Sequence, residues 1–538
     1  MSTAAEPAAT GAGAIEARAA VEAGATALGI EFGSSRVKAV LTGPDNKVLA
    51  SGVFDWENQF VDGLWTYPLD SVWEALRGSY AALKRDVLER HGLRLTRVGG
   101  IVLSAMMHGY LAFDAAGELL VPFRTWRNTN TAAAAAVLSE RLGCNMPLRW
   151  SAAHLYQAML DREPHVPRVE FVTTLAGYAH WRLTGERVLG VGDASGMLPV
   201  SGARRWDAAA VAGFDELARA AAGVPWSVEA LLPKILPAGA AAGRLTAEGA
   251  RLLDPSGDLE AGIPFGPPEG DAGTGMVATG SVAPRSGNVS VGTSVFAMVV
   301  LERALSRAHP EIDLVATPAG DPVAMVHCNN GASELGAWCA LFGEVAEVLG
   351  VPVDDDVLFG ALFRAALRGE PSAGALTAFN YLAGEPITGL AEGRPLFLRA
   401  PDSEFTLANF MRAQLFAVFA TLRLGMDVLA GEAVALDRMF AHGGVFRTAG
   451  VAQRLLAAAL GVPVAVGATA GEGGAWGAAV LAWYARQGRG RDLAAYLAQD
   501  VLADAGVTVV EPDAVDVAGF DEFLRRFVAA LPAVRAAI

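Results

Sequence analysis

The sequence TALGIEFGSSRVKAVLTGPDNKVLASGVF, residues 26–54, contains three apolar runs separated by two short turns, Gly33-Ser34-Ser35 and Pro44-Asp45-Asn46. Closely spaced apolar runs with turn residues between them predict an antiparallel meander of three strands. The residues that follow predict an amphipathic helix over about 69–91, a buried strand over 98–105 and a helix over about 132–142.

The second half of the chain repeats this order of elements. Apolar runs at 288–291, 295–301 and 322–328 predict three strands, and the turn Gly292-Thr293-Ser294 joins the first two. Helical patterns follow at about 333–349 and 406–430, and then a strand, a helix, a strand and a helix over 438–486. The repetition is one of pattern and not of sequence, and it predicts two α/β domains of one architecture.

A chain of 538 residues is too long for one compact core, so two large domains are expected. We place them at 25–280 and 281–538, with a hinge over about 277–285, where Gly280 and Pro284 lie. Residues 1–24 lack both a basic start and an apolar core, so we expect a flexible leader outside the fold.

The composition argues against several classes of protein. Hydrophobic residues make up 52% and charged residues 18%, which suits large cores and argues against disorder. The net charge of −15 argues against general binding to nucleic acid or to anionic membranes. No apolar run that we identify reaches the roughly 20 residues that cross a bilayer. The three cysteines have neither disulfide nor zinc spacing, which indicates a reducing cytoplasm.

Two turns of small and hydroxyl-bearing residues are candidates for binding phosphate. In Gly33-Ser34-Ser35, backbone N–H groups can approach an anion closely, while Lys38 adds a positive charge. Glu31, just before this turn, can hold Mg²⁺ through water. Gly292 and Thr293 form a similar turn at the matching place in the second half. Each turn alone fits a plain hairpin equally well, but the pair favours a nucleotide site.

Three motifs that contain an acidic residue or a histidine are further candidates for contact with a ligand. Asp271 lies among glycines, where a ligand can come close, although an Asp that caps a helix explains it as well. Met107 and His108 follow the predicted strand 98–105, and α/β proteins place ligand contacts at strand ends, although a lone His is usually structural. Asp193 lies in the turn-like segment 192–197.

Paired glycines, Gly443 and Gly444, lie between a predicted strand and a predicted helix. They permit flat contact with a nucleobase and its ribose, and they also fit a tight strand–helix turn. The glycine-rich segment 471–477 opens another predicted helix in the same way.

Taken together and in this order, these motifs resemble the FGGY family of carbohydrate kinases over about residues 27–486, and within it the xylulose kinases most. Segments 29–38 and 290–294 match the two phosphate motifs, and 441–447 and 472–477 match the adenosine segment. The resemblance implies two ribonuclease H-like (actin-like ATPase) domains with a cleft between them.

The resemblance also implies an activity, the transfer of the γ-phosphoryl group of MgATP to a hydroxyl of a ketopentose similar to xylulose. It implies that Asp271 is the catalytic base and that Glu31 holds Mg²⁺ through water. The sugar-binding residues that it implies are Met107, His108, Trp126, Asp193 and Asp271. The ATP-binding residues that it implies are Gly33, Ser34, Ser35, Lys38, Gly292, Thr293, Gly443 and Gly444. ATP and a small sugar are the expected partners of a cytoplasmic enzyme, with a homodimer as a possible assembly.

The sequence departs from the family pattern in three places. Position 31 is Glu where the family usually has Asp, Trp126 is followed by Arg-Asn where the family has Asn-Asp, and Ala272 stands where xylulose kinases often carry Asn. Two alternatives therefore stay open. One is a kinase for another ketose or polyol, such as L-ribulose, L-xylulose or erythritol, and the other is a non-catalytic sugar- or nucleotide-sensing protein on the same fold.

Overall fold

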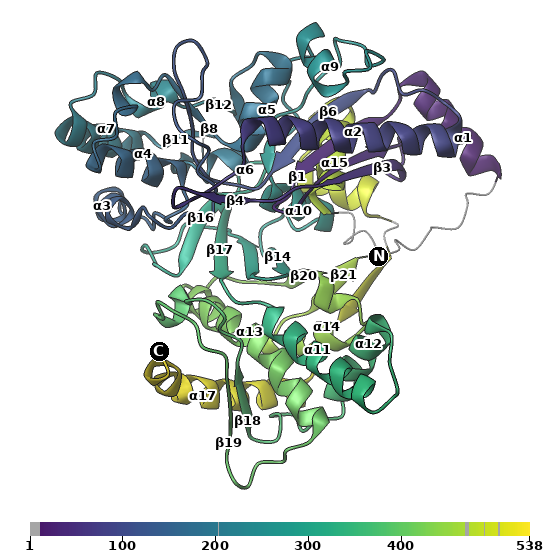
Figure 1. Ribbon diagram of the computed structural model, residues 1–538, viewed down its shortest axis with the longest axis vertical. Coiled ribbons are helices and arrows are strands. Elements are labelled where there is room, and N and C mark those ends of the chain that lie inside the picture. Colours follow the sequence, from purple (N-terminus) through teal and green to yellow (C-terminus); the bar gives the residue numbers. More distant parts are fainter. Residues whose placement is uncertain (1–10, 203, 468–472, 489, 504–505) are drawn as a thin grey trace. The chain divides into compact units, whose positions relative to one another are not determined.

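The computed structural model describes residues 11–202, 204–467, 473–488, 490–503 and 506–538. They form a mixed α/β structure in two compact units (Figure 1). Unit 1 comprises residues 1–282, 314–322 and 472–504, and unit 2 comprises residues 283–313, 323–471 and 505–538.

The central sheet of unit 1 has five strands in the order β13-β6-β1-β2-β3. The expected meander is confirmed, since β1 (Ala27–Phe32), β2 (Arg36–Thr42) and β3 (Val48–Asp55) pair antiparallel. Strand β6 (Gly100–Ala105) pairs parallel to β1, and the short β13 (Glu269–Gly270) pairs parallel to β6. The carboxyl ends of β1, β6 and β13 therefore lie at one edge of the sheet.

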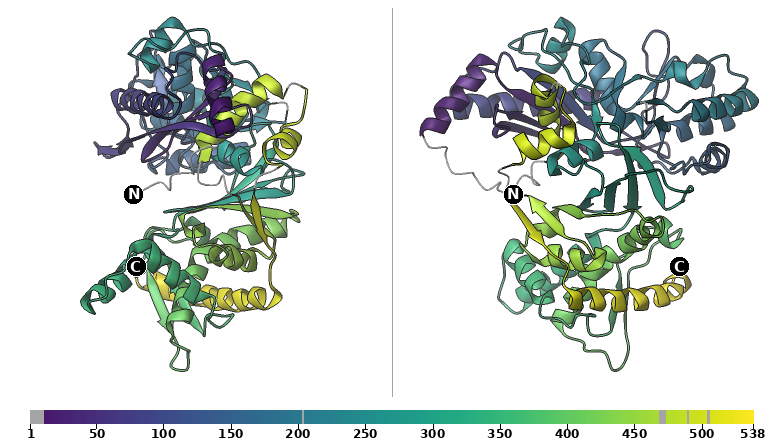
Figure 2. Two further views of the ribbon diagram at one scale, coloured as in Figure 1. Left: turned by 90° about the vertical axis from the view of Figure 1, so that its right-hand side faces the viewer. Right: turned by 180° about the vertical axis from the view of Figure 1, so that it is seen from behind.

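Two helices cover opposite faces of this sheet. Helix α2 (Leu69–His91) packs on β2 and β3, and α15 (Gly473–Gln487) packs on β1, β2 and β6. The left view of Figure 2 shows helices on both sides of the purple strands. Glycine on each face permits the close approach. A Cβ atom at Gly52 would lie 2.1 Å from the Ser79 carbonyl oxygen of α2, and one at Gly29 would lie 1.9 Å from the Ala475 carbonyl oxygen of α15.

The other elements of unit 1 surround this sheet and carry the segment between β6 and β13. Its further strands are β4 (Gln59–Val61), β5 (Leu64–Thr66), β7 (Leu111–Phe113), β8 (Phe171–Thr173), β9 (Val188–Gly190), β10 (Val200–Ser201), β11 (Arg205–Trp206) and β12 (Lys234–Leu236). Its further helices are α1 (Gly11–Ala23), α3 (Ala132–Leu142), α4 (Ser151–Leu160), α5 (Leu175–Thr184), α6 (Val191–Ala194), α7 (Ala208–Ala222), α8 (Val228–Leu231), α9 (Ala247–Leu253), α10 (Asp271–Thr279) and α16 (Leu493–Tyr496).

The sheet of unit 2 repeats the arrangement that the sequence predicts. Strands β14 (Ser286–Val291), β15 (Val295–Val300) and β17 (Pro322–Cys328) pair antiparallel, and β20 (Arg438–Gly443) pairs parallel to β14. Strand β21 (Val464–Gly467) continues the sheet parallel to β20. Strands β16 (Ile312–Ala316) and β22 (Val507–Val510) are the outermost of its seven strands, and the division between the units falls inside β16.

Helices pack below this sheet in the view of Figure 1. They are α11 (Ser333–Val348), α12 (Asp355–Ala366), α13 (Leu407–Gly431), α14 (Val451–Leu460) and α17 (Ala514–Ala536), with a hairpin of β18 (Leu376–Phe379) and β19 (Leu396–Arg399) beside them. Among the described residues, α13 alone is long and apolar enough to cross a membrane, which the sequence analysis did not anticipate. Its apolar window is 67% buried within the structure, so core packing against helices such as α17 accounts for its composition.

The structure differs from the expected organisation at both ends of the chain. Residues 1–10 lie outside the described residues, but Gly11–Ala23 form helix α1, and Val21 is buried in the core of unit 1. The apolar Val21 side chain thus ties to the fold a segment that we expected outside it. The segment 472–504, expected in the second domain, is grouped with unit 1 because α15 packs on β1 and on α10.

Candidate active site

Three side chains mark the edge of the unit 1 sheet at which the parallel strands end. Glu31 of β1 pairs in register with Ser104 of β6, and Ser104 pairs with Glu269 of β13. The Ser104 and Thr274 hydroxyls are hydrogen-bonded at 2.8 Å, which ties α10 to β6. Met107 and His108 follow β6, and Asp271 follows β13, so the register brings the acidic and histidine motifs of the sequence to one edge.

Asp271 is the first residue of α10 and is half-buried. Its Oδ1 accepts hydrogen bonds from the N–H of Ala272 at 2.9 Å and from the N–H of Met107 at 3.4 Å. Burial raises the pKa of Asp271 to about 6, although these two N–H groups work against the shift. The capping interpretation is therefore wrong in detail, because the N-cap residue is Gly270 and Asp271 is the first residue of the helix, placed beside the Met-His motif.

His108 has a left-handed backbone with φ of 70° and is followed by Gly109 with φ of 84°. A non-glycine residue in this region is held there at an energetic cost, which is a feature of functional sites. The His108 ring is stacked with the ring of Trp150, with centroids 6.2 Å apart. Its Nδ1 lies 3.0 Å from the carbonyl oxygen of Gly196, and because a carbonyl oxygen only accepts, Nδ1 carries the proton.

Asp193 lies in α6 and is fully buried. Its Oδ2 accepts the hydroxyl hydrogen of Thr174 at 2.6 Å, whereas Oδ1 has no hydrogen-bond partner among the described residues. Burial is the main cause that raises the pKa of Asp193 to about 7, and the charge of Asp271 adds to the shift. A buried carboxylate oxygen without a partner is costly, so this atom is a natural acceptor for a ligand hydroxyl.

Glu31 is half-buried at the end of β1, opposite Lys38 on β2. Its Oε2 accepts the N–H of Ala475 at 3.2 Å, so the carboxylate lies at the start of α15, where a negative charge is favoured. A Cβ atom at Gly474 would lie 2.5 Å from Glu31 Oε1, which explains glycine there. Burial first, and then the charge of Asp271, raise the pKa of Glu31 to about 7.

Hydrogen bonds to backbone groups stabilise the turn between β1 and β2. The N–H of Gly33 donates to the Arg36 carbonyl at 3.0 Å, and the indole N–H of Trp56 donates to the Gly33 carbonyl at 2.8 Å. The Tyr67 hydroxyl donates to the Ser34 carbonyl at 2.6 Å. The side chains of Ser34 and Ser35 are exposed, so the turn is rigid while its hydroxyls stay accessible.

Trp126 is half-buried and packs against the core of unit 1. Its segment pairs with the residues after His108, because Tyr110 and Arg124 exchange backbone hydrogen bonds of 2.8 and 3.2 Å. Asn128 uses its amide group to bind the backbone of Trp65 at 2.8 and 2.9 Å. One of the positions that depart from the family pattern therefore holds a loop in place.

In unit 2, the two predicted glycine-containing turns lie on neighbouring strands. Gly292 follows β14, Gly443 ends β20, and the two strands run parallel with Val291 opposite Gly443. The carbonyl oxygens of Gly292 and Thr293 accept the N–H groups of Ala332 and Gly331 at 2.8 and 2.7 Å, which fixes the turn against the start of α11. Gly292, Thr293, Gly443 and Gly444 are exposed.

Comparison with known proteins identifies the family. Residues 26–277 match the model of the N-terminal domain of the FGGY family of carbohydrate kinases, and residues 287–486 match that of its C-terminal domain. The chain belongs to the FGGY family of carbohydrate kinases. It is therefore a carbohydrate kinase, and ATP is the phosphoryl donor that the family implies.

Relatives of this FGGY kinase include a xylulose kinase of Klebsiella pneumoniae, 24% identical over 427 residues that cover 78% of this chain and 81% of the relative. The crystal structure of a xylulose kinase from Rhodospirillum rubrum superposes with a TM-score of 0.76 at 22% identity, covering 95% of this chain and 99% of the other. A gluconate kinase from Lactobacillus acidophilus gives the same TM-score, 0.76, at 17% identity, with coverages of 94% and 97%. At these identities the structures share the fold.

The glycines expected in the adenosine segment of this FGGY kinase have a packing role in the structure. Glu472 lies outside the described residues. A Cβ atom at Gly477 would lie 2.1 Å from the Thr274 carbonyl oxygen, so Gly477, like Gly474, lets α15 lie close against the acidic edge of unit 1. The resemblance assigns this motif to the adenosine segment, and that assignment stays a prediction beside the packing role of these two glycines.

Three site residues of this FGGY kinase were missed as separate candidates. Thr174 binds Asp193, Ser195 caps the same helix through the Gly192 carbonyl at 2.6 Å, and Glu269 binds backbone N–H groups of α6. Ser195 and Glu269 lie inside quoted motifs, but nothing in the sequence shows that a carboxylate at 269 reaches residues 76 positions earlier.

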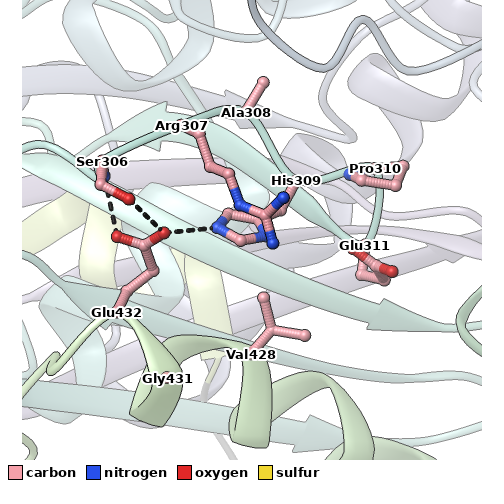
Figure 3. A pocket seen from close by; sticks show the side chains of 9 residues that line it. All are labelled: Ser306, Arg307, Ala308, His309, Pro310, Glu311, Val428, Gly431 and Glu432. Carbon is pink, nitrogen blue, oxygen red and sulfur yellow. Dashed lines mark hydrogen bonds and ion pairs between the residues drawn. The ribbon is translucent and has the colours of Figure 1, made fainter.

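A surface pocket in unit 2 lies elsewhere in the fold of this kinase (Figure 3). Glu432, after the end of α13, accepts hydrogen bonds from the Ser306 N–H at 2.8 Å and hydroxyl at 2.7 Å, and it lies 2.6 Å from Nε2 of His309. These contacts lower the pKa of Glu432 to about 2. None of the predicted site residues lines this pocket, and its polar contacts hold the 306–311 loop against α13.

Proposed function

We propose that this kinase phosphorylates a neutral ketose or polyol, with a xylulose-like ketopentose as the first candidate, and that Asp271 is its general base. The supporting observation is the placement of Asp271 at the strand ends together with Asp193, whose buried Oδ1 lacks a partner among the residues that the structure describes. In this proposal Asp193 and His108 orient the sugar, with Met107 and Trp126 completing its site.

The charge around the acidic edge supports a neutral substrate. Asp271, Asp193 and Glu269 all have raised pKa values, and burial is the largest cause of the shift for each of the three. A sugar acid would bring a negative charge beside three acidic side chains, of which Asp193 and Glu269 are buried and Asp271 is half-buried, and this is unfavourable in a medium of low polarity. The similarity in fold to a gluconate kinase therefore does not extend, in this proposal, to its substrate.

The proposed chemistry asks little of the protein beyond positioning. Asp271 accepts the proton of a sugar hydroxyl while that oxygen attacks the γ-phosphorus of ATP. As the family resemblance implies, the proposal assigns phosphate contacts to Gly33, Ser34, Ser35 and Lys38, and nucleotide contacts to Gly292, Thr293, Gly443 and Gly444. A base with a pKa of about 6 is mostly ionised at neutral pH and still basic enough to take part of the proton in the transition state.

Magnesium fits this edge as an ion that arrives with ATP. The charge of Asp271 raises the pKa of Glu31, so ionised carboxylates at these two positions repel each other and a cation beside Glu31 would relieve that repulsion. Among the described residues there is no cluster of three or more His, Cys, Asp or Glu that could hold a metal by itself. Mg²⁺ typically keeps several waters and binds through one carboxylate and substrate phosphates, and Glu31 is the residue that would hold it here. When bound, the ion neutralises charge on the phosphates.

A panel of sugars tests the substrate proposal. We expect ADP release that depends on a neutral ketopentose or polyol, with D-xylulose, L-xylulose, L-ribulose and erythritol compared at equal concentrations, and no release above background with gluconate. The measurement is a coupled ADP assay with the phosphorylated product confirmed by mass spectrometry. Phosphorylation of gluconate in preference to every neutral sugar would refute the charge argument, and tight sugar binding without any product would favour the sensing alternative.

Glu31→Gln tests the metal role. Gln keeps an oxygen for the Ala475 N–H, so the fold is preserved, but the lost charge should raise the Mg²⁺ concentration for half-maximal activity by roughly tenfold. The measurement is a Mg²⁺ titration at fixed ATP, with sugar KM as the internal reference. Glu31→Asp is the matched control, because it keeps the charge and should stay within about threefold of the wild type. An unchanged Mg²⁺ requirement in the Gln variant would remove Glu31 from the metal site.

A further inference from the structure

Glu269 is a buried carboxylate that the proposed reaction does not use. It is 1% exposed and lies on β13, two residues before Asp271. Its Oε2 accepts the N–H of Asp193 at 3.0 Å, and its Oε1 lies 3.4 Å from the N–H of Gly192. One side chain thus connects the strand that leads to Asp271 with the helix α6 that carries Asp193.

The Glu269 side chain requires glycine at two neighbouring positions. A Cβ atom at Gly190 would lie 2.1 Å from Glu269 Oε1, and one at Gly192 would lie 2.5 Å from Oε2. Any other residue at either position would displace the carboxylate, because real Cβ contacts are never this short. The N–H of Gly190 also donates to the Pro268 carbonyl at 2.8 Å, so the two segments are joined by backbone as well.

Helix α6 has four residues and depends on its surroundings for its conformation. Glu269 satisfies N–H groups at its start, and the Ser195 hydroxyl donates to the Gly192 carbonyl at 2.6 Å and accepts the Ala316 N–H at 2.9 Å. The Asp193 side chain is in turn held through Oδ2 by Thr174. All these contacts leave Asp193 Oδ1 buried and without a partner among the described residues, which is the atom that a ligand hydroxyl would satisfy.

We propose that Glu269 is a positioning residue for sugar binding, which holds α6 so that Asp193 presents Oδ1 to a hydroxyl of the substrate. This inference rests on the proposed sugar site and adds to it a residue that does not touch the substrate. It also accounts for a buried acid beside Asp193, since a carboxyl group offers one oxygen to each of the two N–H groups, whereas an amide side chain of the same size has a single oxygen.

The test compares Glu269→Ala, Glu269→Gln and the wild type as full-length enzyme. In the Ala variant two buried N–H groups lose their acceptor, so we expect the sugar KM to rise about tenfold or more, with the ATP KM within about twofold. Gln keeps an acceptor for the Asp193 N–H and should restore at least half of that loss on a logarithmic scale. Equal changes in the sugar and ATP KM, or a Gln variant as impaired as Ala, would overturn the proposal.

Asp254→Asn is the matched control for lost stability. Asp254 is also buried in unit 1 and binds Lys84 at 2.8 Å, but it has no role in the proposed site. We expect it to lower Tm while the sugar KM stays within about twofold of the wild type. A sugar KM raised as much as in the Glu269→Ala variant would show that general loosening of unit 1, and not the position of α6, is responsible.

Hydrogen exchange separates this inference from the proposed function. If the wild type phosphorylates no sugar of the panel, the substrate proposal fails. Hydrogen exchange in the free protein still tests whether Glu269 holds α6 in place. We expect the Gln and Ala variants to exchange faster than the wild type in peptides that span residues 188–197, with the peptides of α2 unchanged. Exchange over 188–197 that equals the wild type in both variants would overturn the positioning role.

Discussion

Asp271→Asn is expected to lower kcat by roughly 10²- to 10⁴-fold, the usual contribution of a positioned general base. Asn is isosteric and keeps an oxygen for the N–H groups of Ala272 and Met107, so the helix start and the sugar site should survive. Sugar and ATP KM values should therefore stay within about threefold of the wild type. The measurement is steady-state ADP release in the presence and absence of sugar.

Two outcomes would count against the base assignment. Sugar-dependent turnover near the wild-type rate would show that the proton goes elsewhere, and a loss of binding without a loss of kcat would make Asp271 a binding residue only. Ser286→Ala in unit 2 is a suitable control, because its hydroxyl donates only to the Ala283 carbonyl, at 2.6 Å, and it should leave kcat unchanged.

The expected pH dependence of the activity follows from the pKa of Asp271. Asp271 must be ionised to accept a proton, and burial raises its pKa to about 6, so activity should rise with pH through about 6 and level off above about 7. Glu31 and Asp193, with pKa values of about 7, broaden this limb in the free enzyme. The measurement is kcat/KM for the sugar from pH 5 to 9, and a limb centred near the ordinary Asp pKa of about 4 would contradict the burial argument.

Asp193→Asn is expected to separate function from stability. The charge that Oδ1 offers to a sugar hydroxyl is lost, so kcat/KM should fall roughly 10- to 100-fold, mainly through the sugar KM. The buried environment, however, disfavours the ionised form and raises the folded-state pKa of Asp193 to about 7, against about 4 in the unfolded chain. The Asn oxygen still accepts from Thr174, so the variant should be impaired and yet well folded.

The sign of the stability change depends on pH. A raised folded-state pKa gives stability that is complete below pH 4 and is lost as pH rises through about 7. Asn does not titrate, so at pH 8 the variant should be more stable than the wild type by roughly 2–4 kcal/mol, and this difference should shrink towards pH 5. Thermal unfolding at the two pH values measures it, and a variant that is less stable at pH 8 would show that Asp193 is paired and not strained.

The local patterns of the sequence predicted much of the fold. Three apolar runs with two turns predicted the β1–β3 meander, and the spacing of Val72, Leu76 and Leu83 predicted α2, because such patterns depend on neighbours in sequence. Helix α15 was also predicted as an element, but not its place, since that depends on contacts of Gly29 with residues more than 400 positions away. Helices α12 and α17 and the β18–β19 hairpin were missed altogether.

The sequence allowed us to predict which motifs belong to the candidate site, but not how their side chains contact one another. Met107 and His108 follow a predicted strand, so strand-end reasoning placed them at a sheet edge, whereas Asp271 was singled out by its glycine neighbours, and the short β13 that brings it to the same edge was not predicted. Glu269 and Thr174 were missed because each acts on Asp193 through a bond that only the folded chain forms. Glycine was the least informative residue type, since Gly474 and Gly192 each make room for a carboxylate in the folded chain, and the glycine pattern of the sequence did not show this.

A crystal structure of Asp271→Asn with ketopentose and a non-hydrolysable ATP analogue would examine the proposed chemistry at its reacting atoms. We expect a sugar hydroxyl oxygen within roughly 2.6–3.2 Å of the residue 271 side chain and facing the γ-phosphorus, with another hydroxyl bonded to Asp193 Oδ1. A sugar bound without either contact, or with its nearest hydroxyl turned from residue 271 towards a different acid, would contradict the role assigned to this edge of the sheet.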